Sequence, residues 1–281
     1  MCYVILSRIT CLSQLYLLDF DPKKIYCNEN AKREAKSINE RALNKKTTEW
    51  DLTKENTIKL TTLNVRSLQK HYEDLISDDY IQKSDIICIQ ETWLNADPSE
   101  GLTEFEAHFL NLKSKGIALF SKKRPDDIQK RSYENSSIIL ATYGNFDVIS
   151  VYRFSEHHRL IEFTDNIMKL VNINHTVIIL GDVNLDLNKN PTNLFTKTLQ
   201  NFGFVQLVNH PTNILGGIID HVYFYSPTDA SCRINKTHPM YYSDHDAVTL
   251  FSEFKRQGRK FMHSFETFSS THDFQEIGCI Y

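Results

Sequence analysis

Short apolar runs separated by polar segments are the dominant pattern along this chain. Residues 86–89 and 177–180 are continuous aliphatic stretches, a pattern typical of strands that are buried on both faces. Residues 58–62 instead alternate between apolar and polar side chains, as expected for a strand with one buried face. The same criteria predict further strands, with turns at 122–127 and 143–145, over 116–120, 136–142, 146–152, 218–225 and 247–254.

Apolar residues at helical spacing predict three helices among these strands. The first begins after the cap residue Ser67, the second covers 160–171, and the third opens at Asn190-Pro191 and ends before Gly203. The side chains expected to face the core are Leu68, Tyr72, Leu75 and Ile76 in the first helix, and Leu194, Phe195, Thr198 and Leu199 in the third.

The balance of elements, about eight or nine strands to three helices, excludes an all-parallel doubly wound sheet because hairpins and crossovers are mixed. It predicts an α/β (α+β) fold in which two packed sheets are flanked by helices. Regular patterning starts near residue 57 and fades after 255, so we expect one domain over 57–255. Residues 1–56 are then an extension that is partly a polar lead-in, and 256–281 form a tail.

The composition limits which binding partners and which cellular compartment we expect for the protein. The formal net charge of -3 offers no general attraction to nucleic acid, so DNA binding would need a local basic patch. The six cysteines contain no C-x-x-C pair, which favours reduced thiols inside a cell. The apolar stretch 4–18 is short and interrupted by polar residues, so we expect neither a membrane span nor a secretory signal.

Polar residues follow three of the predicted strands and carry the candidate chemistry. Glu91 follows the run 86–89, Asp182 and Asn184 follow 177–180, and His245 stands in a Ser-Asp-His-Asp sequence. Converging carboxylates indicate a hard divalent cation, and a nearby histidine indicates attack on a phosphate. Each signal alone has a plainer interpretation: a surface glutamate, an Asx turn, or one of 11 histidines.

Asp220 is the least ordinary of these residues because it lies inside the apolar run 218–222. A carboxylate buried in a strand is costly unless it is paired. Its most economical partner is an imidazole or a cation.

Taken in order, these clusters resemble the endonuclease/exonuclease/phosphatase superfamily, which has the deoxyribonuclease I-like fold. The resemblance implies a four-layer α/β/β/α sandwich of two mixed sheets flanked by helices. Several phrases look most like endonuclease domains of mobile elements, either non-LTR retrotransposons or modules appended to some rolling-circle transposons. The matching motifs are Leu63 to Leu68, Ile89 to Leu94, Gly116 to Phe120, Val151 to Arg153, Gly181 to Asn184, Gly217 to Val222 and Ser243 to Asp246.

The resemblance also implies a role for each matching residue. Glu91 looks like the ligand of Mg²⁺ or Mn²⁺, helped by Asn64 and Asp244. Asp182 would orient or deprotonate the attacking water, and Asn184 would hold a phosphate oxygen. The remaining matches are His245 on the scissile phosphate, Asp220 as its orienting carboxylate, Tyr152 near the phosphate or leaving group, and Thr212 and Ser243 as phosphate or supporting contacts.

The leading hypothesis is therefore a metal-dependent, DNA-nicking endonuclease derived from a transposable element and acting in the nucleus. Alternatives are another phosphoesterase of the same superfamily, acting on RNA, abasic-site DNA or a phosphoinositide, and an inactive copy that only binds nucleic acid. DNA backbone contacts are expected from Arg66 and Arg153 and from a hairpin beside the site that carries Lys122, Lys123 and Arg124. The plainer interpretation of that basic hairpin is a solvated surface.

Overall fold

The computed structural model describes residues 57–98, 102, 104–154, 159–228 and 230–253. The predicted extension and tail, 1–56 and 256–281, lie outside these ranges. Residues 254 and 255, the last two of the domain expected over 57–255, lie outside them as well. No helix within the described ranges is long and apolar enough to cross a membrane.

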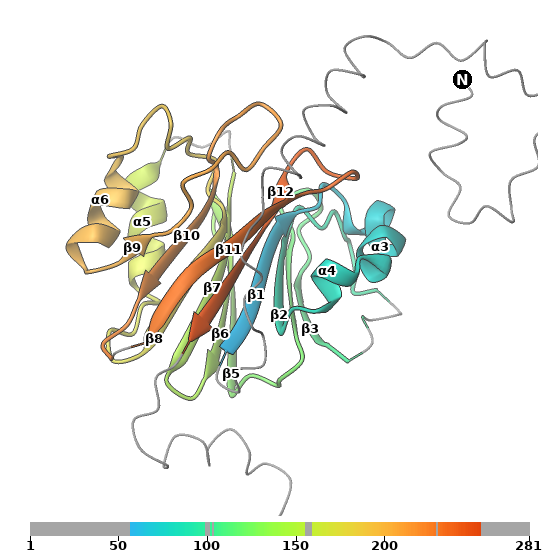
Figure 1. Cartoon of the computed structure of the whole chain (residues 1–281), viewed down its shortest axis with the longest axis horizontal. Coiled ribbons are helices and arrows are strands. Elements are labelled where there is room, and N and C mark those ends of the chain that lie inside the picture. The colour runs from blue at the N-terminus through green and yellow to red at the C-terminus, as the bar shows by residue number, and fades with distance from the viewer. Residues whose placement is uncertain (1–56, 99–101, 103, 155–158, 229, 254–281) are drawn as a thin grey trace, which may run out of the picture. The chain divides into compact units, whose positions relative to one another are not determined.

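Two six-stranded mixed sheets form the centre of the described domain (Figure 1). In each sheet one central pair, β1–β2 or β7–β8, is parallel and the other pairs are antiparallel. The first sheet has the order β11 (Ser231–Pro239), β12 (Asp246–Glu253), β1 (Thr57–Asn64), β2 (Ile86–Gln90), β4 (Ile117–Ser121), β3 (Glu106–Leu110). The second has the order β5 (Asp127–Ser132), β6 (Ser136–Tyr143), β7 (Phe146–Arg153), β8 (Thr176–Asp182), β10 (Asp220–Tyr225), β9 (Val205–Gln206).

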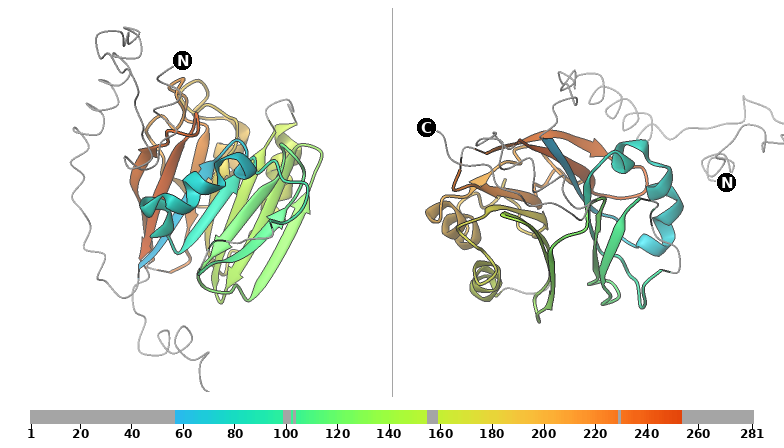
Figure 2. Two further views of the ribbon diagram at one scale, coloured as in Figure 1. Left: turned by 90° about the vertical axis from the view of Figure 1, so that its right-hand side faces the viewer. Right: turned by 90° about the horizontal axis from the view of Figure 1, so that it is seen from below.

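Helices cover the outer face of each sheet (Figure 2). Helices α3 (Leu68–Ser77) and α4 (Asp79–Gln82) pack on the first sheet, and α5 (Leu160–Met168) and α6 (Leu194–Asn201) pack on the second. Buried apolar side chains accordingly fill three layers, one between the sheets and one beneath each pair of helices. This arrangement confirms the predicted four-layer sandwich.

The predicted cap is correct for the first helix, whereas the start of the third helix and two of the core-facing residues were predicted wrongly. The Ser67 hydroxyl accepts the N–H of Lys70 at 3.2 Å and begins α3, as expected. The α6 cap is Asn193, three residues after the expected start, because its side chain accepts the Thr196 N–H at 3.0 Å. Ile76 and Leu194, both predicted to face the core, are 38% and 43% exposed because they lie on the outer edges of their helices.

Four strands were missed by the sequence patterns: β3, β5, β9 and β11. All four are at or next to sheet edges, where only part of the side-chain set is buried and alternation is lost. Strand β5, for example, begins at Asp127, inside the predicted turn, and its residues are mostly exposed. Strands at sheet edges thus account for the difference between the predicted and observed counts.

Candidate active site

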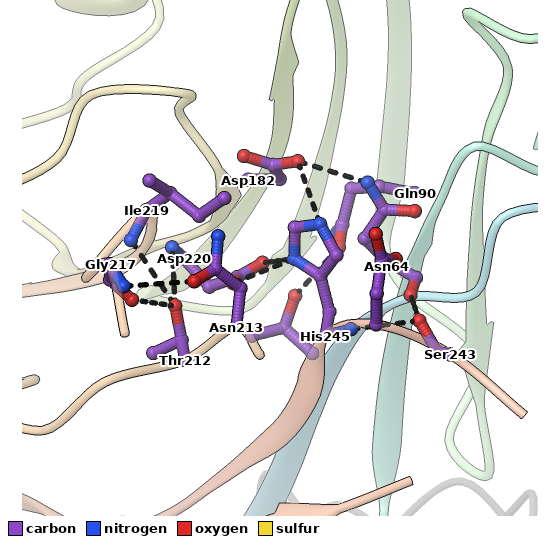
Figure 3. Close-up of polar contacts among 12 residues, drawn as sticks. Asn64, Gln90, Asp182, Thr212, Asn213, Gly217, Ile219, Asp220, Ser243 and His245 are labelled. Carbon is purple, nitrogen blue, oxygen red and sulfur yellow. Dashed lines mark hydrogen bonds and ion pairs between the residues drawn. The ribbon is translucent and has the colours of Figure 1, made fainter. Parts of the chain in front are cut away.

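Strand register brings the predicted site residues to one end of the two sheets. Asn64, the last residue of β1, pairs with Gln90, the last of β2, so Glu91 follows beside it. In the second sheet Asp182, at the end of β8, pairs with both Tyr152 of β7 and Asp220 of β10. The polar strand ends that are far apart in the sequence therefore meet at one place, as Figure 3 shows for Asn64, Asp182, Asp220 and His245.

Asn64 connects the two sheets through its side-chain amide. The Nδ2 group donates to Glu91 Oε1 at 2.9 Å and to Asp182 Oδ2 at 2.9 Å. Asn64 is fully buried, and its Oδ1 accepts the backbone N–H of Arg66 at 3.1 Å. One amide thereby fixes the positions of two carboxylates that belong to opposite sheets.

Glu91 is held on both of its oxygens. Besides Asn64, Oε1 accepts the Tyr152 hydroxyl at 2.9 Å, and Oε2 accepts the Trp93 indole N–H at 3.1 Å. The sequence did not predict the Trp93 contact. The Trp93 indole can donate to a side chain two residues earlier only when the backbone between them turns sharply. Glu91 and Trp93 indeed have φ values of 53° and 55°, and such strained conformations cluster at functional sites.

His245 and Asp220 form a buried hydrogen-bonded pair. The imidazole Nδ1 lies 2.9 Å from Asp220 Oδ2 and 3.1 Å from Oδ1. The other ring nitrogen, Nε2, faces Asp182 Oδ2 at 3.9 Å. The imidazole is thus the partner that the burial of Asp220 required.

Burial and mutual charge displace the pKa values of this cluster. Burial and the neighbouring Asp220 carboxylate raise the pKa of Asp182 to about 7, against the opposing effects of His245 and Asn64. Burial would lower the pKa of His245, but the Asp220 and Asp182 carboxylates outweigh it and raise that pKa to about 10. At neutral pH the imidazole is therefore cationic, while Asp182 exchanges its proton near pH 7.

The loop after β8 depends on a close approach between two strands. Gly181 has a φ of 137°, and a Cβ there would lie 2.0 Å from the Val151 carbonyl oxygen of β7. Only glycine fits this position. Two residues on from Asp182, the backbone N–H of Asn184 donates to Asp182 Oδ1 at 2.9 Å, which is the Asx-type turn that was the plainer interpretation of this pair.

Arg153 supports that loop and does not reach solvent. Its side chain is 4% exposed, and its guanidinium faces the carbonyl oxygens of Val183 and Asn184 at 3.3 and 3.4 Å. The Asn184 amide returns a hydrogen bond to the Arg153 carbonyl at 2.7 Å. The prediction that Arg153 contacts DNA is therefore wrong, because a buried side chain that is committed to backbone oxygens cannot reach a phosphate.

Ser243 and Thr212 hold backbone around the site. The Ser243 hydroxyl donates to the Asn64 carbonyl at 2.6 Å and accepts the His245 N–H at 3.1 Å. Thr212 is fully buried, and its hydroxyl accepts the N–H groups of Ile219 and Asp220 at 3.2 and 3.1 Å. The sequence suggested either a phosphate contact or a supporting contact for Ser243 and Thr212. Their hydrogen bonds favour the supporting role for both residues.

The basic hairpin does not lie beside the site. In the antiparallel β2–β4 pair, Gln90 is opposite Ile117 and Ile86 is opposite Ser121. Lys122, Lys123 and Arg124 follow Ser121 and are consequently at the opposite end of the sheet from Glu91. The expectation that they flank the active site is wrong, since the strand direction could not be known from the sequence.

Comparison with known proteins decides the family. The sequence profile described as the endonuclease/exonuclease/phosphatase family matches residues 61–245. The chain belongs to the endonuclease/exonuclease/phosphatase family. Members of this family are hydrolases that act on phosphodiester bonds and typically depend on a divalent metal ion. No curated protein sequence matches the chain.

Solved structures share the fold. An AP endonuclease from Archaeoglobus fulgidus superposes with a TM-score of 0.53 at 19% identity, covering 71% of this chain and 100% of the other. A 3′-5′ exonuclease (NExo) from Neisseria meningitidis gives 0.55 at 19%, covering 70% and 99%. An endonuclease/exonuclease/phosphatase family protein from Leptotrichia buccalis gives 0.53 at 14%, covering 70% and 100%. At these identities the likeness establishes the fold alone.

Two oxygen-rich positions are candidates for the metal ion of this family. Glu91 presents a carboxylate that Asn64, Tyr152 and Trp93 hold in place, and Asp244 Oδ1 is buried without a hydrogen-bond partner among the described residues. Its other oxygen, Oδ2, pairs with Arg66 at 2.6 Å. Carboxylate and amide oxygens suit a hard cation such as Mg²⁺, so Glu91, Asn64 and Asp244 fit the group.

A second cluster, formed by Asp182, Asp220 and His245, also brings three ligand atoms within 4.8 Å of one another. In this cluster His245 Nδ1 is already hydrogen-bonded to Asp220 Oδ2 at 2.9 Å, and Nε2 faces Asp182 Oδ2 at 3.9 Å. This geometry suits the holding and moving of a proton.

Proposed function

We propose that the chain is a DNA-nicking endonuclease, dependent on Mg²⁺ or Mn²⁺ and derived from a transposable element. The observation that carries this proposal is the Asn64 bridge between Glu91 and Asp182. It places a candidate metal ligand next to a candidate general base, and the Asp220–His245 pair adjoins that base. Phosphodiester hydrolysis needs these three components together.

Each residue then has one task. Asp182 takes the proton of the attacking water, for which a carboxylate pKa of about 7 is well matched near neutral pH. The cationic His245 donates from Nε2 to a phosphate oxygen as charge develops there, and Asp220 keeps its ring oriented. Glu91 and Asn64, with Asp244, would hold the metal ion, whose charge would offset the charge that develops on the phosphate and the leaving oxygen.

The choice of DNA and of a mobile-element origin rests on the sequence motifs. The phrases Asn64-Val65-Arg66-Ser67-Leu68, Glu91-Thr92-Trp93-Leu94 and Ser243-Asp244-His245-Asp246 resemble endonuclease domains of such elements. The candidate catalytic and metal-binding residues that those motifs contribute converge on the site, which argues against a decayed copy. RNA, abasic DNA and phosphoinositides remain the alternative substrates of the same centre.

Nicking of supercoiled plasmid by the purified protein tests the proposal. We expect open-circular product with Mg²⁺ or Mn²⁺ and none in EDTA. Asp182→Asn should remove the product, whereas Asp165→Asn, which alters an exposed carboxylate on α5, should not. Equal nicking by wild type and Asp182→Asn would contradict the proposed centre. Cleavage of an RNA or abasic oligonucleotide but not of plasmid would move the function to the alternative substrates.

A further inference from the structure

A surface groove of about 480 Å³ adjoins the site and has not been assigned a role above. Its lining includes two exposed aromatic side chains, Trp93 and Tyr241, the buried Tyr242, and the cationic Arg66 and Lys70. Ser243 and Asp244 belong to the same lining, and they immediately precede His245 in the chain. The groove is therefore continuous with the segment that carries the candidate phosphate-binding imidazole.

Tyr241 is exposed and yet held in position. The residue is 81% exposed, which is unusual for an aromatic side chain that is also constrained at both ends. Its hydroxyl donates to Asp74 Oδ1, and its ring meets the buried Tyr242 edge-on at a centroid distance of 5.0 Å. Tyr242 is in turn stacked on His71 at 5.6 Å. These contacts fix the ring while leaving its surface free.

Trp93 is presented in a similar way. It is 43% exposed, and its indole N–H is anchored to Glu91 Oε2 at 3.1 Å. Its left-handed backbone, with a φ of 55°, turns the side chain back toward the site instead of into the core. A rigid aromatic ring that stays solvent-exposed has already lost the rotamer freedom that binding would otherwise cost.

Exposed aromatic rings beside cationic side chains form the surface that binds unpaired nucleotides. Bases stack on the rings whatever their sequence, while arginine and lysine contact the backbone. Bases that are paired and stacked within a duplex cannot offer both faces to such rings. The Arg66 guanidinium is half-exposed at the groove, so it can reach a phosphate of the same strand.

From this geometry we infer that the groove binds an unpaired nucleobase of the substrate strand, stacked on Trp93 and Tyr241 next to the reacting phosphate. The inference rests on the proposed nuclease function and adds a substrate preference to it. The enzyme should favour single-stranded or locally opened DNA over fully paired DNA.

Binding measured in EDTA tests this preference without requiring cleavage. The probes are a fluorescein-labelled 12-nucleotide oligo-dT and a blunt-ended duplex in which the same labelled strand is fully paired with oligo-dA. Tyr241→Ala removes the exposed ring, Tyr241→Phe keeps it, and Phe202→Ala removes an exposed ring on the distant α6 end as a matched control. A Trp50→Phe background leaves Trp93 as the sole tryptophan, whose emission reports stacking directly.

We expect oligo-dT to bind more tightly than the duplex and to quench Trp93. Tyr241→Ala should weaken oligo-dT binding about tenfold, within the range measured for one base–aromatic stack. Tyr241→Phe keeps the ring but loses the bond to Asp74, so its affinity should fall between those of Tyr241→Ala and wild type, whereas Phe202→Ala should stay near wild type. Equal affinity for the two probes, or unchanged oligo-dT affinity in Tyr241→Ala, overturns the inference. Because no cleavage is needed, a failure of plasmid nicking is a separate result that bears only on the proposed function.

Discussion

Asp182 illustrates how a single residue can serve the reaction at the expense of stability. It is buried, close to a second carboxylate, and its pKa is raised to about 7. An ionised carboxylate in this position is costly to the fold. Residues of this kind are often the ones whose neutralisation stabilises a protein while it abolishes activity.

Asp182→Asn should therefore raise the melting temperature, and more so at high pH. A folded-state pKa raised above the unfolded value means that folding favours the protonated form. Protonated Asp182 therefore makes its full contribution to the free energy of unfolding below about pH 4. This contribution is lost as the pH rises through about 7. We expect the Asp182→Asn variant and wild type to differ little at pH 4 and by roughly 2–4 °C or more at pH 8, measured by calorimetry in EDTA. A difference that shrinks with rising pH would contradict this assignment.

Glu91→Gln should weaken metal binding. The substitution removes the charge and places an amide N–H opposite a donor, the hydroxyl of Tyr152 or the indole of Trp93. We expect Mn²⁺ affinity, measured by titration calorimetry, to fall by about 10- to 100-fold or more. Glu73→Gln, an exposed glutamate on α3, is the control and should bind as wild type does. Unaltered Mn²⁺ affinity in Glu91→Gln would remove Glu91 from the metal site.

At the scale of elements, the close contact between β7 and β8 sets the position of Asp182. Gly181→Ala should destabilise the fold by about 3 kcal/mol or more, because a Cβ meets the Val151 carbonyl and the backbone has a positive φ. Gly144→Ala shares the positive φ but has open space around its Cβ, so it should cost only about 1–2 kcal/mol. Urea unfolding of the two variants measures the difference. Equal costs would mean that the strand approach is not tight.

The central strands could be predicted from the sequence because their side chains are buried. The runs 86–89 and 177–180 became β2 and β8, and the predicted hairpin became β6–β7. Edge strands such as β5 were not readable, since most of their residues face solvent and show no period. Burial also explains the best single prediction about the site: the cost of an isolated Asp220 required a partner, and His245 supplies it.

Two predictions about DNA contacts failed for different reasons, burial for Arg153 and strand direction for the Lys122 hairpin. Arg153 was placed on the DNA and is buried under the β8 loop, and the Lys122 hairpin was placed at the site and lies at the other end of β4. The Trp93–Glu91 bond was missed because it depends on local backbone reversal. Sequence patterns indicate which side chains are buried, but the end of the sheet at which they lie follows from register.

At the scale of the whole molecule, DNA contacts should come from the groove face. In EDTA, Arg66→Ala should lower the salt dependence of DNA binding by about one unit of log–log slope, since one phosphate contact is lost. The triple change Lys122→Ala/Lys123→Ala/Arg124→Ala should leave that slope unchanged, because those residues follow the far end of β4. Fluorescence anisotropy across a series of salt concentrations distinguishes them. The opposite ranking would place the DNA on the far side of the sheet.

The central claim is that Asp182 and His245 act on one phosphate within a single centre. Single-turnover nicking of plasmid by Asp182→Asn, His245→Ala and the double variant, at saturating Mg²⁺, tests it most directly. We predict that each single change slows cleavage by several orders of magnitude and that the double variant is hardly slower than the worse single one. Near-wild-type cleavage by either single variant, or losses that multiply in the double variant, would contradict the claim.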